Sequence, residues 1–104
     1  HDGDDDHEHD DFDSIVLDIG EIADPADLAA RIVRIAQQHQ ILRVKGYAAV
    51  ADKPMRLLVQ AVGTRVRYHY DRPWRPGEAR RTTLVVIAER DHIDGEALHT
   101  ALVG

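Results

Sequence analysis

The first thirteen residues constrain the fold most, because they offer almost nothing that a folded core could use. Eleven of the thirteen are His, Asp or Glu, and no apolar residue appears before Phe12. Such a segment cannot bury enough apolar surface to offset the entropy lost on ordering. We therefore expect residues 1–11 to be a disordered His/Asp-rich linker, and residues 12–104 to form the folded domain.

The chemistry of the linker is narrower than its structure. Imidazole nitrogens and carboxylate oxygens are ligands of divalent first-row metals, and His-rich tracts are typical of metal binding. The chain contains no cysteine, so nitrogen and oxygen atoms must hold any metal. We predict weak, linker-borne binding of a divalent metal, with the alternative that the segment is only a solvated acidic linker. The candidate ligands are His1, His7, Glu8, His9 and Asp10.

The net charge of −6 is concentrated in the linker. The first thirteen residues hold eight carboxylates and no Lys or Arg, which leaves 11 of the 19 acidic residues against 13 basic ones. A nearly neutral body does not favour non-specific nucleic-acid binding. No signal peptide and no apolar run of the roughly 18 residues needed for a membrane helix is present. We expect a cytoplasmic protein without nucleic-acid or membrane partners, and interpret the missing initial Met as the mark of a fragment.

Hydrophobic periodicity predicts the element order β-α-β-β-β-β-α. Residues 55–62 and 65–70 are predicted to form a hairpin that turns at Gly63-Thr64. Asp24-Pro25 and Asp94 provide helix starts, and each following helix carries a single apolar stripe that must lie on a sheet. Residues 82–89 are almost continuously apolar, which favours a central strand covered on both faces. Gly46, inside a strand, indicates a bulge or a close backbone approach. We expect an α+β fold, a ferredoxin-like variant, with a mainly antiparallel sheet of four or five strands and both helices on one face.

The irregular segment 71–81 contains the only Trp of the chain and several arginines. Arginine and aromatic side chains on one loop are typical of a partner-docking surface. The alternative is a loop that the Trp pins to the core. The candidate docking residues are Arg72, Trp74, Arg75, Arg80 and Arg81.

No enzymatic signature is found in the chain. It contains no Gly-rich phosphate loop, no nucleophile elbow and no cysteine nucleophile. We therefore predict that it is not an enzyme, with no catalytic residues. The remaining histidines, His39, His69, His92 and His99, are interpreted as structural surface residues.

Three stretches together resemble the C-terminal domain of the CobW family. They are the acidic His tract that leads into DFDS at 11–14, the strand ILRVKGY at 41–47, and the strand RTTLVVI at 81–87. The resemblance covers the whole chain, and the run KPMRLLVQAVG with DRPW beyond it is most similar to the cobalamin-biosynthesis branch.

The resemblance implies a role in metal delivery. Full-length members of the family are P-loop GTPases that act as metallochaperones, and their GTP and Mg²⁺ site and Cys-x-Cys-Cys metal site belong to an N-terminal domain that this chain does not contain. The implied cargo is cobalt(II), delivered towards cobaltochelatase, or zinc(II) in sister branches. We therefore expect a non-catalytic accessory domain whose partners are its own N-terminal GTPase domain and cobaltochelatase subunits. The alternatives are a stand-alone metal-binding or buffering module and an RNA-binding α+β module.

Overall fold

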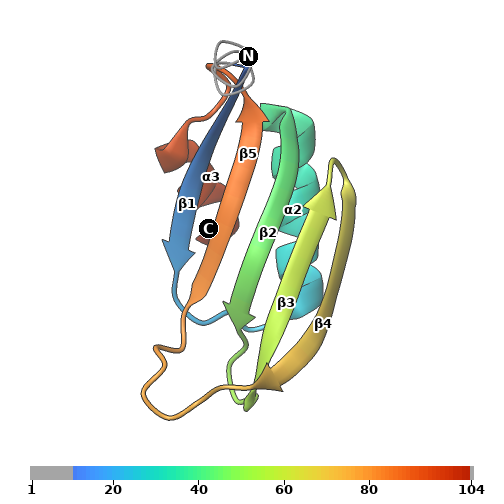
Figure 1. Ribbon diagram of the computed structural model, residues 1–104. Helices are drawn as coiled ribbons and strands as arrows, with labels where there is room; N and C mark the ends of the chain where they lie inside the picture. Colours follow the sequence, from blue (N-terminus) through green and yellow to red (C-terminus); the bar gives the residue numbers. More distant parts are fainter. Residues whose placement is uncertain (1–10, 104) are drawn as a thin grey trace, which may run out of the picture.

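Seven helices and strands follow one another in the predicted order in a computed structural model, which describes residues 11–103 (Figure 1). The elements are β1 (Phe12–Ile19), α2 (Pro25–His39), β2 (Ile41–Ala49), β3 (Met55–Val62), β4 (Arg65–Pro73), β5 (Thr82–Glu89) and α3 (Gly95–Val103). The α+β class predicted from the sequence is confirmed.

The five strands form one sheet in the order β1-β5-β2-β3-β4, and every neighbouring pair is antiparallel. Because β5 is antiparallel to both β1 and β2, these two strands run parallel to each other with β5 between them. This is a split β-α-β unit, the feature that relates the fold to ferredoxin-like proteins. The hairpin predicted at residues 63–64 joins β3 to β4.

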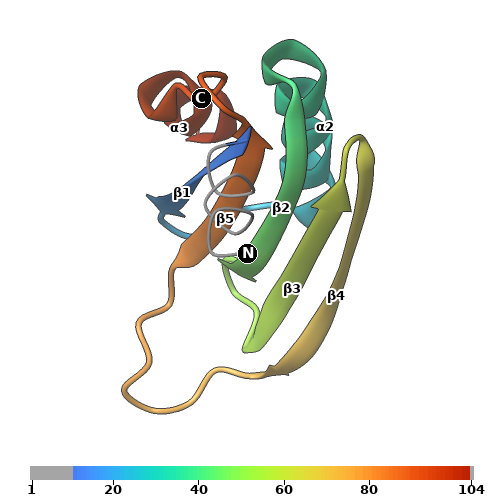
Figure 2. The same ribbon diagram turned by 45° about the horizontal axis from the view of Figure 1, so that its top comes forward.

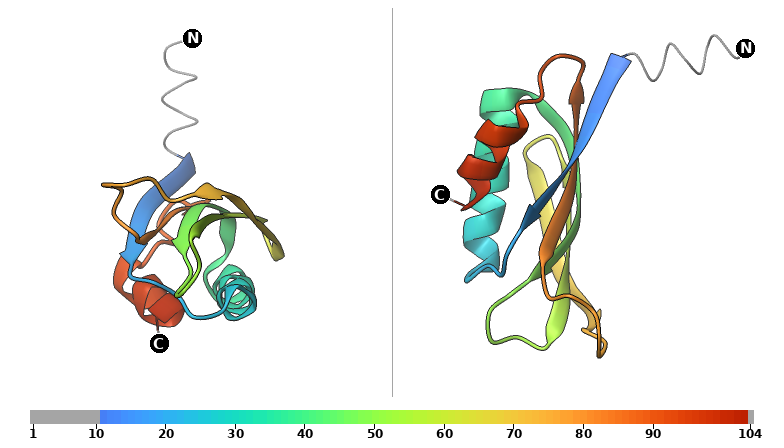
Figure 3. Two further views of the ribbon diagram at one scale, coloured as in Figure 1. Left: turned by 90° about the horizontal axis from the view of Figure 1, so that it is seen from below. Right: turned by 90° about the vertical axis from the view of Figure 1, so that its left-hand side faces the viewer.

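Both helices cover the same face of the sheet, as predicted (Figures 2 and 3). Helix α2 begins where the Asp24 carboxylate accepts a hydrogen bond from the Ala26 amide at 2.9 Å, and helix α3 begins where Asp94 caps the Ala97 amide at 3.1 Å. The buried stripes of the two helices are Leu28, Ile32, Ile35 and Ala36 in α2 and Leu98 and Leu102 in α3. In the part of the chain that the structure describes, no helix is long and apolar enough to cross a membrane.

Strand β5 corrects one prediction. Its residues alternate between buried and exposed, with Leu84 and Val86 fully buried under the helices and Val85 40% exposed on the opposite face. The expectation of a strand covered on both faces is therefore wrong. A continuous apolar run does not reveal whether each face of a strand has a covering layer. Here both helices pack on the face that carries Leu84 and Val86, and the opposite face has no covering layer among the described residues.

Strand β4 extends to Pro73, three residues beyond the predicted end of that strand. The register shifts next to Asp71, and pairing resumes between Arg56 and Arg72. The Asp71 carboxylate of this bulge is held by the Arg56 guanidinium, so the ladder continues past the irregularity. The irregular segment consequently begins at Trp74.

Candidate functional site

The loop from Trp74 to Arg81 lies at the end of the sheet where β1 stops, far from the start of β1 (Figure 1). Trp74 is half-buried, its backbone amide donates to the Pro54 carbonyl at 3.0 Å, and the Arg80 guanidinium lies 5.8 Å from its ring centroid. Its Nε1 is buried and has no hydrogen-bond partner within residues 11–103. The indole therefore packs inward, as the alternative of a pinned loop requires.

Two of the predicted docking arginines join this loop to the rest of the domain. Arg80 pairs with Glu21 at 3.0 Å and donates to the Val50 carbonyl at 3.0 Å. Arg81 pairs with Asp18 at 2.8 Å, and both partners of that pair are about half exposed. These contacts fix the loop against the end of β1, the segment that follows it and the residue after β2, so both side chains have a structural role.

Arg72 at the end of β4 and Glu78 in the loop form a fork-to-fork pair. Two nitrogens of the guanidinium meet the two carboxylate oxygens at 2.8 Å each, and the Arg75 amide donates to the same carboxylate at 2.6 Å. These hydrogen bonds, that from Arg72 first, lower the pKa of Glu78 to about 2, and the same contact raises the pKa of Arg72. The carboxylate thus stays ionised and keeps the loop closed at neutral pH.

This lowered pKa predicts a pH-dependent loop. A carboxyl group with a pKa below its ordinary value of 4.5 stabilises the folded state above that value, and the contribution is lost as pH falls towards 2. Trp74 is the only Trp, so its fluorescence reports on this loop. We expect a fluorescence transition between pH 4.5 and pH 2 in the native chain and its loss in Glu78→Gln. A transition that persists unchanged in Glu78→Gln would assign it to another carboxyl group.

Arg75 differs from the other predicted docking residues. It is exposed and makes no salt bridge within residues 11–103, whereas Arg72, Arg80 and Arg81 each pair with a carboxylate of the same domain. Of the four arginines of residues 71–81, the structure thus leaves one without such a pair.

The predicted metal ligands His1, His7, Glu8, His9 and Asp10 lie outside the described residues. Among residues 11–103, no three His, Cys, Asp or Glu side chains are grouped closely enough to hold a metal ion. His69 is exposed on β4, two residues after Arg67, and His99 is exposed on α3.

The sheet face opposite the helices was not singled out as a site from the sequence. The strand register arranges its side chains in rows that cross all five strands. One row contains Ser14, Ile87, Arg43, Val62 and Arg65. The next row contains Val16, Val85, Lys45, Gln60 and Arg67. One side of this open face is therefore apolar and the other is basic.

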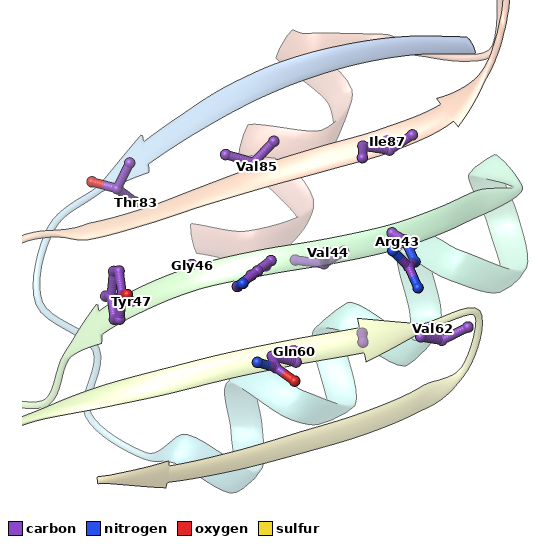
Figure 4. Close-up of a pocket in the computed structure, with 11 residues that line it drawn as sticks. Arg43, Val44, Gly46, Tyr47, Gln60, Val62, Thr83, Val85 and Ile87 are labelled. Carbon is purple, nitrogen blue, oxygen red and sulfur yellow. The ribbon is translucent and has the colours of Figure 1, made fainter. Parts of the chain in front are cut away.

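We call Arg43, Lys45, Arg65 and Arg67 the cationic stripe. All four are exposed, and within residues 11–103 none of them has a salt bridge or a side-chain hydrogen bond. A groove of about 610 Å³ lies on this face over β2, β3 and β5, and Arg43 and Lys45 of the stripe are among the residues that line it. Figure 4 shows the residues of β2, β3 and β5 that line it.

Only the register reveals this surface. The alternation of β2 places Arg43 and Lys45 on one face, and the alternation of β4 places Arg65 and Arg67 on one face. That the two pairs share the same face, separated by β3, follows from the pairing of Arg43 with Val62 and of Val62 with Arg65. The hairpin was predicted from the sequence, but its position beside β2 was not.

Comparison with known proteins defines the class. The sequence profile described as "Cobalamin synthesis protein cobW C-terminal domain" matches residues 12–104. The chain therefore belongs to the family of CobW C-terminal domains, as the resemblance in the sequence indicated.

Individual relatives are similar over most of this chain. A "Zinc chaperone CobW" from Sinorhizobium is 48% identical over 102 residues, which are 98% of this chain and 28% of that protein. A "Zinc chaperone CobW" from Pseudomonas aeruginosa is 51% identical over 76 residues, 73% of this chain and 20% of that protein. The crystal structure of the Zn(II)-bound YjiA GTPase from E. coli superposes with a TM-score of 0.72 and 26% identity, covering 93% of this chain and 30% of that one. The chain thus spans less than a third of these relatives.

Proposed function

We propose that this chain is the non-catalytic C-terminal accessory domain of a GTP-dependent metal chaperone, and that its N-terminal segment collects the metal. The family membership supports the first part, because two similar proteins are named zinc chaperones and a third is a Zn(II)-bound GTPase. The observation that carries the second part is the donor set of residues 1–10, three imidazoles and six carboxylates.

A tethered segment of this kind serves delivery better than storage. Donors on a short chain hold metal weakly, but their attachment raises the metal concentration near any site to which the domain is linked. The metal is cargo here, handed on to a tighter site. The names of the relatives favour zinc(II) as the cargo; cobalt(II) remains the ion implied by the cobalamin branch. Imidazole and carboxylate donors bind both ions, and selectivity between them depends on geometry and on metal availability rather than on raw affinity.

Calorimetric titration with zinc(II) and cobalt(II) tests this proposal. We expect micromolar binding by the intact chain and a loss of affinity of at least about tenfold when His1, His7 and His9 are all replaced by alanine. The reason is that carboxylates alone are poor ligands for these ions.

The matched control replaces His69, His92 and His99 with alanine. These three histidines are exposed, so the control removes the same number of imidazoles from the surface of the folded domain. Its metal affinity should equal that of the unmodified chain. Loss of binding in the control, with retention in the first variant, would move the site into the folded domain and contradict the proposal.

A third part of the proposal concerns the loop from Trp74 to Arg81. We propose that it docks to the GTPase domain or to a client such as a cobaltochelatase subunit. Arg75 is the side chain placed to make this contact, because it is exposed and its neighbours are paired within the domain. In the full-length protein, Arg75→Ala should weaken partner binding by about 1 kcal/mol or more without changing the unfolding midpoint. Lys53→Ala, which removes an exposed cation from a nearby turn, is the control; equal binding in both variants would remove the loop from the interface.

A further inference from the structure

No residue of the cationic stripe forms a salt bridge within the described domain. Two carboxylates of the open face are already paired, Asp18 with Arg81 and Asp71 with Arg56. A third, Glu89 at the end of β5, is exposed and has no salt bridge within residues 11–103, so one unpaired carboxylate faces four cations. Four exposed cations on β2 and β4, with only β3 between them, repel one another, so an anionic group bound there would relieve this repulsion. The stripe therefore has the chemistry of a docking surface for something acidic.

A suitable acidic segment is attached to the same sheet. Residues 1–10 carry six carboxylates and no Lys or Arg. The segment joins the fold at Asp11, whose carbonyl oxygen accepts a hydrogen bond from the Arg90 amide at 3.1 Å, next to the start of β1. The row that contains Arg43 and Arg65 crosses β1 at Ser14, two residues after Phe12. The acidic segment thus begins at the end of the sheet where the stripe lies.

The distances allow the contact. Neighbouring strands lie about 4.8 Å apart, so β4 is roughly 19 Å from β1 across the sheet. Ten extended residues reach up to roughly 33 Å, which spans the whole stripe with several residues to spare. Each charge pair on an exposed surface is weak, but attachment in the same chain raises the effective concentration of the segment.

Single-stranded nucleic acid fits this surface less well. Such ligands stack their bases on exposed aromatic side chains. Tyr47 is the aromatic residue in the groove, and the Arg56 guanidinium already lies 3.6 Å from its ring centroid. The favoured occupant is therefore acidic polypeptide.

We propose that the cationic stripe Arg43, Lys45, Arg65 and Arg67 is the docking surface for the acidic segment 1–10, and that metal capture by the segment releases it. The release step rests on the metal-collecting role proposed above. A bound divalent ion neutralises carboxylates that would otherwise meet the stripe, so docking and metal binding oppose each other. Because such coupling is reciprocal, the stripe also lowers the metal affinity of the segment.

Amide NMR spectra of the intact chain and of a variant that lacks residues 1–10 test the docking. The deletion leaves the core intact, since every buried core residue lies between Leu17 and Leu102. We expect amide shifts at the four stripe residues and none at Arg34, which is on the helix layer. In about 1 M salt, where the screening length falls to about 3 Å, the two spectra should coincide at the stripe.

Zinc titration tests the coupling. Zinc added to the intact chain should move the stripe resonances towards their positions in the deletion variant. The double variant Arg43→Gln and Arg65→Gln should bind zinc about threefold more tightly than the unmodified chain, because docking no longer competes. Arg34→Gln with Lys53→Gln removes the same charge from other surfaces, and its zinc affinity should be unchanged.

The outcomes separate this inference from the metal role. Identical spectra with and without residues 1–10 overturn the docking, even if zinc binds. Zinc binding that leaves the stripe resonances unmoved overturns the coupling and preserves the metal role. Shifts on deletion without any zinc binding overturn the metal role and support the docking alone. Shifts that vanish on dilution would assign the stripe to a second copy of the chain and overturn docking within one molecule.

Discussion

Gly46→Ala is expected to destabilise the domain by about 3 kcal/mol or more, enough to leave much of the chain unfolded. A Cβ atom at this position would lie 2.0 Å from the Thr83 carbonyl oxygen and 2.9 Å from the Leu84 Cα. Both are backbone atoms of β5, and β5 pairs with β2 along most of its length. Relief therefore requires separation of two interior strands, which breaks hydrogen bonds on both sides of the clash.

Gly20→Ala provides the matched control. No heavy atom lies within 4 Å of a Cβ at Gly20, and the position lies after β1, outside the sheet ladder. Urea unfolding followed by circular dichroism should show a midpoint close to that of the unmodified chain for Gly20→Ala and a much lower one for Gly46→Ala. Equal midpoints for the two variants would show that β5 can move away at little cost.

This glycine explains in physical terms the stretch on which the family resemblance rests. In RVKGY, Arg43 and Lys45 face the open side of the sheet, Val44 enters the core, and Gly46 permits the close approach of β5. From the sequence, Gly46 indicates either a bulge or a close backbone approach. The structure supports the second interpretation, because the backbone of β5 lies against Gly46. The choice depends on which strand becomes the neighbour, and β5 is nearly forty residues away in the chain.

Local signals were sufficient for the helices and their inward faces. The Asp24 and Asp94 caps and the apolar stripes depend on residues within a few positions of one another, so the sequence contains all the information required. The open face depends on long-range pairing and on a covering layer that is absent there. For that reason the expectation that both faces of β5 are covered was wrong, and the cations of β2 and β4 could not be combined into one surface from the sequence.

The paired arginines of the loop illustrate the same limit for the candidate site. Composition identified an arginine-rich loop around Trp74, but it could not show that Glu21 and Asp18, about sixty residues earlier, neutralise Arg80 and Arg81. An arginine on a loop is therefore a docking candidate only if no carboxylate of the same domain pairs with it, and this can be judged only from the structure. By this criterion the cations without a salt bridge within residues 11–103 include the four of the open face and Arg75 of the loop.

Leu98→Ala is expected to lower the free energy of unfolding by about 3 kcal/mol. Helix α3 has nine residues, too short to be stable alone in water, so it depends on the side chains that it buries. Leu98 is fully buried and Leu102 is 3% exposed, and both belong to the core beneath the sheet. Truncating Leu98 removes most of this anchor and leaves a cavity that the short helix cannot fill.

Val103→Ala tests whether the effect comes from burial rather than from any change in the helix, because Val103 lies on α3 and is 52% exposed. Its free energy of unfolding in urea should change by no more than about 0.5 kcal/mol. Under conditions in which Leu98→Ala remains folded, its zinc affinity should match that of the unmodified chain, since the proposed ligands precede the folded domain. A comparable loss of stability in both variants would mean that α3 is held by its backbone contacts, such as that of the Ala101 carbonyl with Arg31 at 3.1 Å, and not by its buried leucines.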